Sequence, residues 1–188
     1  MKKLSVFLML VLLMVSRGYS GVVWENDCSS MDGWSSGSGN GIGVYLSGGT
    51  IQMNSWANNG SNAGWTNLWR GTDVTIEADT EYDLIVNMKS FANEAPVTLK
   101  IQSIIDGTWA TIKEESINPL ADSFNDYTLS ISTVNDLNSE HIGGTLAIGI
   151  APGWWNNLGI DHVSIVPEPA SLLILGLGVI GQLRRRQR

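Results

Sequence analysis

The stretch Tyr-Asp-Leu-Ile-Val-Asn-Met-Lys-Ser, residues 82–90, alternates between apolar and polar side chains. In an extended chain its even positions fall on one face and its odd positions on the other, with Ile85 as the apolar exception. The stretch 97–105 repeats this period of two. Its outward-facing polar side chains are Thr98, Lys100 and Gln102. Such alternation is typical of antiparallel strands with one buried face, so it predicts an all-β fold.

Further short strands are expected on both sides of these two, separated by glycine, asparagine and aspartate. The remaining candidates are residues 22–25, 43–47, 50–56, 73–78, 108–115, 124–134, 144–151 and 158–166. Gly48-Gly49 and Asp106-Gly107 are expected to form hairpin turns. Helical spacing is nowhere sustained. About nine or ten strands of this kind predict two packed antiparallel sheets, a jelly-roll-like β-sandwich.

The N-terminus has the features of a secretory signal peptide. Lys2 and Lys3 precede an apolar run over residues 4–15, and small residues follow at Gly18 and Ser20. A signal peptidase reads small residues at such positions. Residues 1–20 are therefore expected to be a helical signal peptide, with cleavage after Ser20.

The C-terminus has three ordered parts: a proline-rich break, an apolar run and a basic end. Pro167-Glu168-Pro169 comes first, and the apolar run covers residues 172–181. The basic end consists of Arg184, Arg185, Arg186 and Arg188. The fourteen residues 170–183 would form a helix about 21 Å long, short of the roughly 30 Å hydrocarbon core of a bilayer. The order of these parts predicts a sorting signal with a short hydrophobic helix that anchors the chain only briefly.

These C-terminal residues resemble the PEP-CTERM anchor of bacterial surface proteins. The resemblance implies that Pro167, Glu168 and Pro169 are the sorting motif and that residues 166–188 are the anchor segment. It also implies transient residence in the inner membrane and release by an exosortase-type transpeptidase. The terminal arginines would remain on the cytoplasmic side and stop transfer there.

Residues 21–165 remain as one expected domain of 145 residues. They contain four basic and seventeen acidic residues, a net charge of −13. A surface this acidic repels phosphate backbones, which excludes nucleic acid as a partner, and it suits a hard cation such as calcium. Cys28 has no partner for an intrachain disulfide. It is expected to be a buried apolar residue, the alternative being a thiol available for intermolecular pairing.

Three pieces of this domain are similar to carbohydrate-binding modules of the galactose-binding-like jelly-roll type. The pieces are Glu25 with Asp32-Gly33-Trp34, Val74 to Tyr82, and Gly159 to Ile165. The resemblance implies a structural calcium ion between an acid near the first strand and an aspartate on the last strand. Glu25 and Asp161 match those positions. Asp161 is expected to share a face with Val163 and Ile165 and to point inward.

The eight tryptophans divide by their surroundings. Trp24, Trp34 and Trp109 are flanked by strand-like sequence and are expected in the core. The other five lie among asparagine, glycine and threonine, where an exposed ring can stack on a sugar while amides bind its hydroxyl groups. These glycan-binding candidates are Trp56, Trp65, Trp69, Trp154 and Trp155. The alternative is that they plug the ends of the sandwich.

No set of residues suggests catalysis. His141 and His162 have no metal-binding spacing, and the adjacent Glu114 and Glu115 would face opposite sides of a strand. The sequence therefore predicts an exported, exosortase-sorted protein of the cell surface or extracellular matrix, with a non-catalytic, glycan-binding sandwich. The alternatives are a purely structural protein of the exopolysaccharide matrix and a carbohydrate-active enzyme of the same fold.

Overall fold

A computed structural model describes most of the expected domain and the sorting motif. The described residues are 22–38, 43–54, 57–58, 62–63, 66–91, 96–121, 123–153 and 157–169. The expected signal helix at residues 1–20 and the expected C-terminal helix, with its four arginines, lie outside these ranges. Within them, no helix has the length and apolar character that crossing a membrane requires.

The described part of the chain forms thirteen strands and two short 3-10 helices. The strands are β1 (Trp24–Asn26), β2 (Ser35–Ser38), β3 (Val44–Ser47), β4 (Thr50–Asn54), β5 (Ala57–Asn58), β6 (Asn62–Ala63), β7 (Thr66–Thr75), β8 (Thr80–Ser90), β9 (Val97–Ile105), β10 (Thr108–Ile117), β11 (Asn125–Ser132), β12 (Thr145–Pro152) and β13 (Asn157–Pro169). The helices are η1 (Val134–Asp136) and η2 (Ser139–His141). The all-β prediction is confirmed for these residues.

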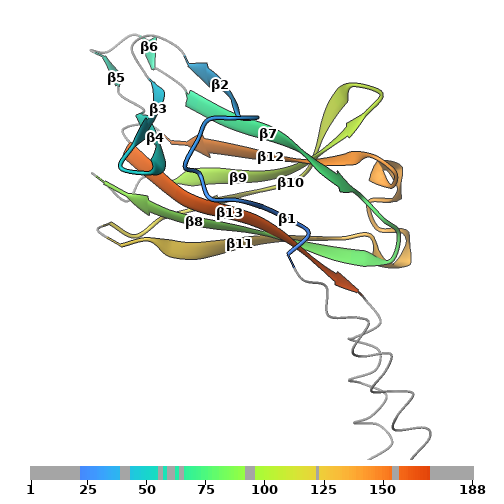
Figure 1. Ribbon diagram of the computed structural model, residues 1–188. Coiled ribbons are helices and arrows are strands. Elements are labelled where there is room, and N and C mark those ends of the chain that lie inside the picture. The colour runs from blue at the N-terminus through green and yellow to red at the C-terminus, as the bar shows by residue number, and fades with distance from the viewer. Residues whose placement is uncertain are drawn as a thin grey trace, which may run out of the picture.

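Two antiparallel sheets lie one above the other (Figure 1). The first sheet has the order β11-β8-β13-β4-β3, with β1 paired to β13. The second sheet has the order β10-β9-β12-β7-β2. A small ladder joins β5 to β6. The expected sandwich is thus present, and its inner faces form one hydrophobic core.

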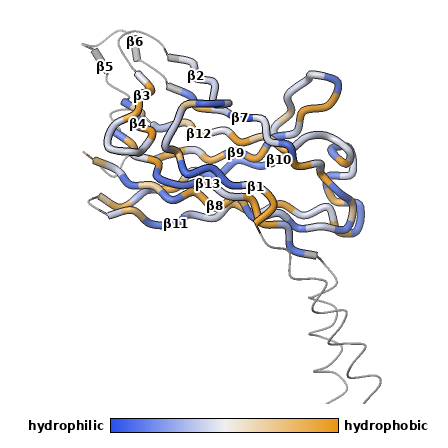
Figure 2. Tube along the Cα trace, viewed as in Figure 1, coloured by the Kyte–Doolittle hydropathy of each residue, from blue (hydrophilic) through white to orange (hydrophobic). Residues whose placement is uncertain are grey.

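The alternation in residues 82–90 gives β8 one buried face, as predicted. Tyr82, Leu84, Val86 and Met88 are buried at 2% exposure or less. The odd positions of β8 are only partly buried, and the tube coloured by hydropathy shows the same alternation along the strands (Figure 2). Each strand therefore covers the core with every second side chain.

Both predicted hairpin turns are present. Gly48 and Gly49 connect β3 to β4 with φ of 61° and 80°, a conformation that glycine adopts without steric cost. Asp106 and Gly107 connect β9 to β10 with φ of 51° and 77°. Both turns have positive φ at their two central residues, as a two-residue hairpin requires.

Five strands differ clearly from the prediction, and the two short ones, β5 and β6, lie between the expected strands at residues 50–56 and 73–78. β2 forms between the expected strands at residues 22–25 and 43–47, because Ser35 to Ser38 pair with Trp69 to Thr66 of β7. β7 begins at Thr66, seven residues before the expected strand at residues 73–78. β13 does not end at Val166 but continues through the sorting motif to Pro169. Pairing with neighbouring strands outweighs weak local propensity in each case.

Candidate functional site

The outer face of the second sheet has a strip of small residues at its centre. On β12, Ala147, Gly149 and Ala151 alternate with core residues, so they lie on the outer face. Trp69 of β7 is directly opposite Gly149 on one side, and Lys100 of β9 is opposite it on the other. Large side chains on both sides of small ones create a depression in the sheet surface.

This depression, which we call the β12 trough, has a volume of about 330 Å³. Its lining residues are Asn67, Leu68, Trp69, Lys100, Gln102, Trp109, Gly149, Ile150 and Ala151. Trp69 and Lys100 are two strands apart, a separation of about 10 Å between their backbones. The trough therefore combines two indole rings with an ammonium group and two amides.

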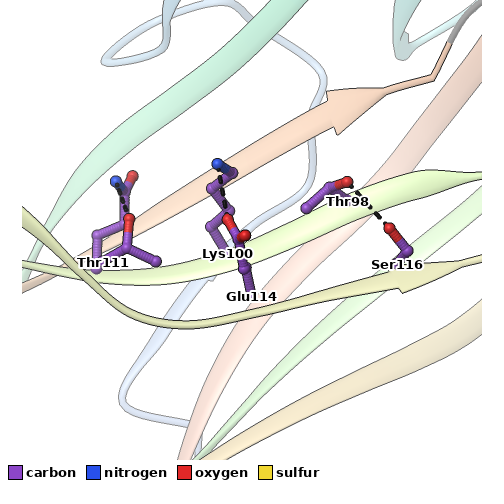
Figure 3. Close-up of polar contacts among 6 residues, drawn as sticks. Thr98, Lys100, Thr111, Glu114 and Ser116 are labelled. Atoms are coloured by element: carbon purple, nitrogen blue, oxygen red, sulfur yellow. Dashed lines mark hydrogen bonds and ion pairs between the residues drawn. The ribbon is translucent and has the colours of Figure 1, made fainter.

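A row of polar contacts holds one wall of the trough in place. The pairs are Gln102 Nε2 to Thr111 Oγ1 at 3.2 Å, Lys100 Nζ to Glu114 Oε2 at 2.9 Å, and Thr98 Oγ1 to Ser116 Oγ at 3.3 Å. Figure 3 shows these contacts crossing from β9 to β10. Because Glu114 compensates the charge of Lys100, this wall carries no net charge.

Gln102 also presents an acceptor to the floor of the trough. Its Oε1 would lie 3.1 Å from a Cβ atom built on Gly149, so the oxygen stands directly over the glycine. Its Nε2 donates a hydrogen bond to Thr111 Oγ1, which fixes the orientation of the amide. A carbonyl oxygen of this kind accepts a hydrogen bond from a hydroxyl group.

Trp109 is on the surface, so its expected place in the core is wrong. Its side chain is 42% exposed. The reason is the register set by the Asp106-Gly107 turn, which places Trp109 opposite Ile104. Ile104 is on the same face of β9 as Gln102, so Trp109 also faces outward, toward the trough.

The other tryptophans fall into three groups. Trp34 is buried at 8% exposure, as predicted, and Trp24 is partly buried against the core. Trp69 is the one glycan-binding candidate that lies within the described ranges, and it lines the β12 trough. Trp56, Trp65, Trp154 and Trp155 lie outside the described residues.

The expected inward position of Asp161 is also wrong. A register shift between Ile160 and His162 interrupts the alternation of β13, and Asp161 at this bulge is exposed. Glu25 is exposed as well. In the described ranges no group of three or more His, Cys, Asp or Glu side chains could hold a metal ion. Two exposed carboxylates supply few of the six to eight oxygens that calcium takes, and calcium binding at Glu25 and Asp161 stays a prediction.

Cys28 is fully buried, as expected. Burial raises the pKa of its thiol to about 12, and the Asp161 and Asp27 carboxylates act in the same direction, whereas Arg70 opposes them. The backbone N–H of Cys28 is held by Asn26 Oδ1 at 3.0 Å, which fixes this turn. The thiolate is the reactive form of cysteine, and it is scarce here at neutral pH.

We therefore expect native Cys28 to react with iodoacetamide at pH 7.5 on the order of a hundredfold more slowly than in the unfolded chain. Mass spectrometry of the protein labelled with and without denaturant measures this ratio. Equal rates in the two states would contradict the buried position of the thiol.

His141 has a structural contact. Its Nδ1 lies 2.8 Å from Ser103 Oγ, and Ser103 is fully buried on β9. The contact connects η2 to the second sheet across thirty-eight residues of sequence. His141 thus satisfies a buried hydroxyl group, which a core residue of this kind requires.

The fold and site define a β-sandwich with an aromatic and polar trough on one sheet, followed by a sorting signal. Residues 166–188 match the PEP-CTERM protein-sorting motif. That motif is characteristic of exported proteins processed by an exosortase. No curated protein sequence matches the chain.

Several solved structures share the fold. BiXyn10A CBM1, a carbohydrate-binding module solved without ligand, is 18% identical and superposes with a TM-score of 0.51, covering 77% of this chain and 97% of its own. A CBM4 module is 16% identical with a TM-score of 0.50, covering 80% and 97%. A cyclase from Fischerella sp. TAU is 12% identical with a TM-score of 0.50, covering 78% and 89%. At these identities the likeness concerns the fold alone.

Proposed function

We propose that this chain is an exported protein, released by an exosortase-type transpeptidase at the cell surface or into the extracellular matrix, whose sandwich binds a glycan without catalysis. The observation that carries the glycan part is the β12 trough. The sorting motif at residues 166–188 supports the export part. Several carbohydrate-binding modules share this fold, so the sandwich is compatible with glycan binding. The trough supplies the side chains that contact the sugar.

The trough suits a sugar chain for three reasons. Trp69 and Trp109 offer flat apolar rings, which stack on the apolar faces of pyranose rings. Gln102 Oε1 offers an oriented hydrogen-bond acceptor, and Asn67 adds an amide to the lining beside those rings. The small residues of β12 leave the floor low enough for a ring to settle between the walls.

The two tryptophans also indicate the length of the ligand. They belong to β7 and β10, which are separated by β12 and β9. Trp109 is opposite Ile104, which pairs with Thr145, whereas Trp69 is opposite Gly149, four residues farther along β12. At about 3.3 Å per residue and 4.8 Å per strand, a ligand touching both rings extends diagonally over more than one sugar.

The charge of the site favours an uncharged glycan. The domain carries a net charge of −13, and Glu114 pairs with the lysine of the trough. An acidic polysaccharide would be repelled by the surrounding surface and would gain little from Lys100. A neutral polysaccharide is not repelled by this surface and does not depend on an ion pair with Lys100.

The test is retention of the purified full chain on immobilised neutral and acidic polysaccharides, followed by a glycan array. The expected result is retention on a neutral polysaccharide and none on an acidic one. Absence of retention on every glycan would reject binding and favour the purely structural matrix protein. Release of sugar fragments from any polysaccharide would instead reject the non-catalytic part of the proposal.

A further inference from the structure

The sorting motif is part of the sandwich. β13 pairs with β8 up to its last residue, so that Pro167 is opposite Tyr82, Glu168 is opposite Glu81 and Pro169 is opposite Thr80. A processing enzyme that acts at this motif therefore meets a hydrogen-bonded strand.

The two prolines occupy the positions at which they do not interrupt this pairing. The carbonyl of Ile165 accepts a hydrogen bond from the Val23 N–H at 3.0 Å, so the backbone of Ile165 faces β1. Alternate residues of a strand face the same neighbour. Pro167 and Pro169 therefore point their nitrogen atoms away from β8, and Glu168 faces β8 with its N–H and C=O. Proline is tolerated in a sheet where its missing N–H faces an edge.

A hydrogen bond of β8 leads independently to the same orientation of the two backbones. The carbonyl of Thr80 accepts a hydrogen bond from the Thr133 N–H at 2.8 Å, so Thr80 faces the β11 side. Glu81, the next residue, consequently faces β13. The backbones of Glu81 and Glu168 therefore form the hydrogen-bonded pair that closes this end of the ladder.

The side chains of Glu81 and Glu168 destabilise the pairing of β13 with β8 at this end. Tyr82 and Ile165 are buried in the core. Side chains alternate along a strand, so Glu81, one residue before Tyr82, and Glu168, three residues after Ile165, point to the outer face. Two carboxylates directly opposite each other on one face of a sheet repel. Glu168 is exposed, and no described cationic residue forms an ion pair with either carboxylate.

The end of β13 is also weakly supported elsewhere. β4 pairs with β13 at residues 157–160 and β1 pairs with it at residues 163–165. In the described ranges no strand pairs with that edge at residues 166–169. Beneath the strand end, Pro167 lines a hollow of about 340 Å³ together with Val23 and Tyr82. Among the described strands, β8 is thus the one that pairs with residues 166–169.

We propose that the exosortase-type enzyme processes the motif only after residues 166–169 have left β8, and that the Glu81–Glu168 pair sets how often this opening occurs. An enzyme that cuts a peptide forms its own hydrogen bonds to an extended backbone, and those groups of Glu168 are occupied in the closed strand. In transpeptidation the acyl group at the cut passes to an enzyme nucleophile and then to an acceptor amine. The anchor segment leaves with the amino group of the broken peptide bond. When opening and closing are fast, the rate follows the population of the open form.

The inference is tested with the full chain in cells that contain the sorting enzyme, by pulse-chase measurement of the conversion of precursor to processed protein. Glu81→Lys replaces repulsion with attraction and leaves the motif itself unchanged. We expect conversion to slow about three- to tenfold, with Glu81→Gln between Glu81→Lys and the wild type. Glu115→Lys is the matched control, because it makes the same charge change on exposed β10, and its rate should equal that of the wild type.

A second measurement separates opening from a direct effect on enzyme recognition. Hydrogen exchange at the Glu168 amide of the unprocessed chain reports the open population. Slower exchange in Glu81→Lys, in proportion to the slower conversion, supports the proposal. Unchanged conversion, or slower conversion with unchanged exchange, overturns it. Glycan retention of Glu81→Lys should match the wild type, so failure here is distinguishable from failure of the glycan proposal.

Discussion

Replacing Arg70 with alanine is expected to lower the free energy of unfolding by about 2–4 kcal/mol. Arg70 lies between two tryptophan rings, with Cζ 5.1 Å from the centroid of Trp24 and 5.6 Å from that of Trp34. Its Nη1 donates to the carbonyl of Asp32 at 2.6 Å. Truncation removes all three interactions and leaves a gap between the rings.

The position of these residues explains why the loss should be large. Trp24 belongs to β1 of the first sheet, and Arg70 belongs to β7 of the second sheet. The guanidinium therefore joins the two layers at a place where the chain passes from one to the other. Trp34 Nε1 donates to Asn26 Oδ1 at 3.1 Å, which couples the same cluster to the turn after β1. Loss of Arg70 loosens this whole corner of the core.

Urea unfolding followed by tryptophan fluorescence measures the change. Arg70→Lys keeps the charge but not the planar group that stacks on indole rings, and should recover less than half of the loss. Lys113→Ala is the matched control, because Lys113 reaches the Ser130 carbonyl at 2.9 Å on the exposed surface and should cost about 1 kcal/mol or less. An equal cost for Arg70→Ala and Lys113→Ala would show that the cluster does not stabilise the fold.

The sheets could be predicted from the sequence where one face of a strand is fully apolar. Residues 82–90 and 97–105 alternate without ambiguity, and the Asp106-Gly107 turn fixes the following hairpin. β2 could not be predicted in this way. Ser35 to Ser38 lack the branched and aromatic residues typical of strands, and they are extended because β7 offers a free edge. Such an edge exists only after the fold has formed.

The candidate site was predicted only in part, for a related reason. The alternation of residues 97–105 correctly predicted Lys100 and Gln102 on the outer face. The strand-like sequence around Trp109 wrongly predicted that its ring is buried. Propagating the register from the Asp106-Gly107 turn would have placed Trp109 beside them. The exposure of Asp161 could not be predicted from the sequence. A bulge is an extra residue in one strand, so it can be recognised only when the pairing with the neighbouring strand is known. The extension of β13 through Pro169 was hidden because proline usually ends a strand.

Replacing Trp69 with alanine is expected to weaken glycan binding at least about tenfold while the melting temperature changes little. Trp69 stands opposite Gly149 at the centre of the second sheet, on the face that points away from the core. Its ring is the aromatic surface that β7 contributes to the trough. Removal abolishes stacking but leaves no cavity in the core, because Leu68 and Arg70 carry the inward contacts of β7.

Binding is measured by retention on the polysaccharide identified for the wild type, and by titration calorimetry with its oligosaccharides. Trp109→Ala should also weaken binding, and more for long oligosaccharides than for short ones, because the two rings lie diagonally across the sheet. Phe91→Ala serves as the control. Phe91 is 43% exposed but packs beside Lys89 on the first sheet, so its loss should leave binding unchanged. If Trp69→Ala and Phe91→Ala weaken retention equally, the interaction is a general effect of exposed aromatic surface and the trough is not the binding site.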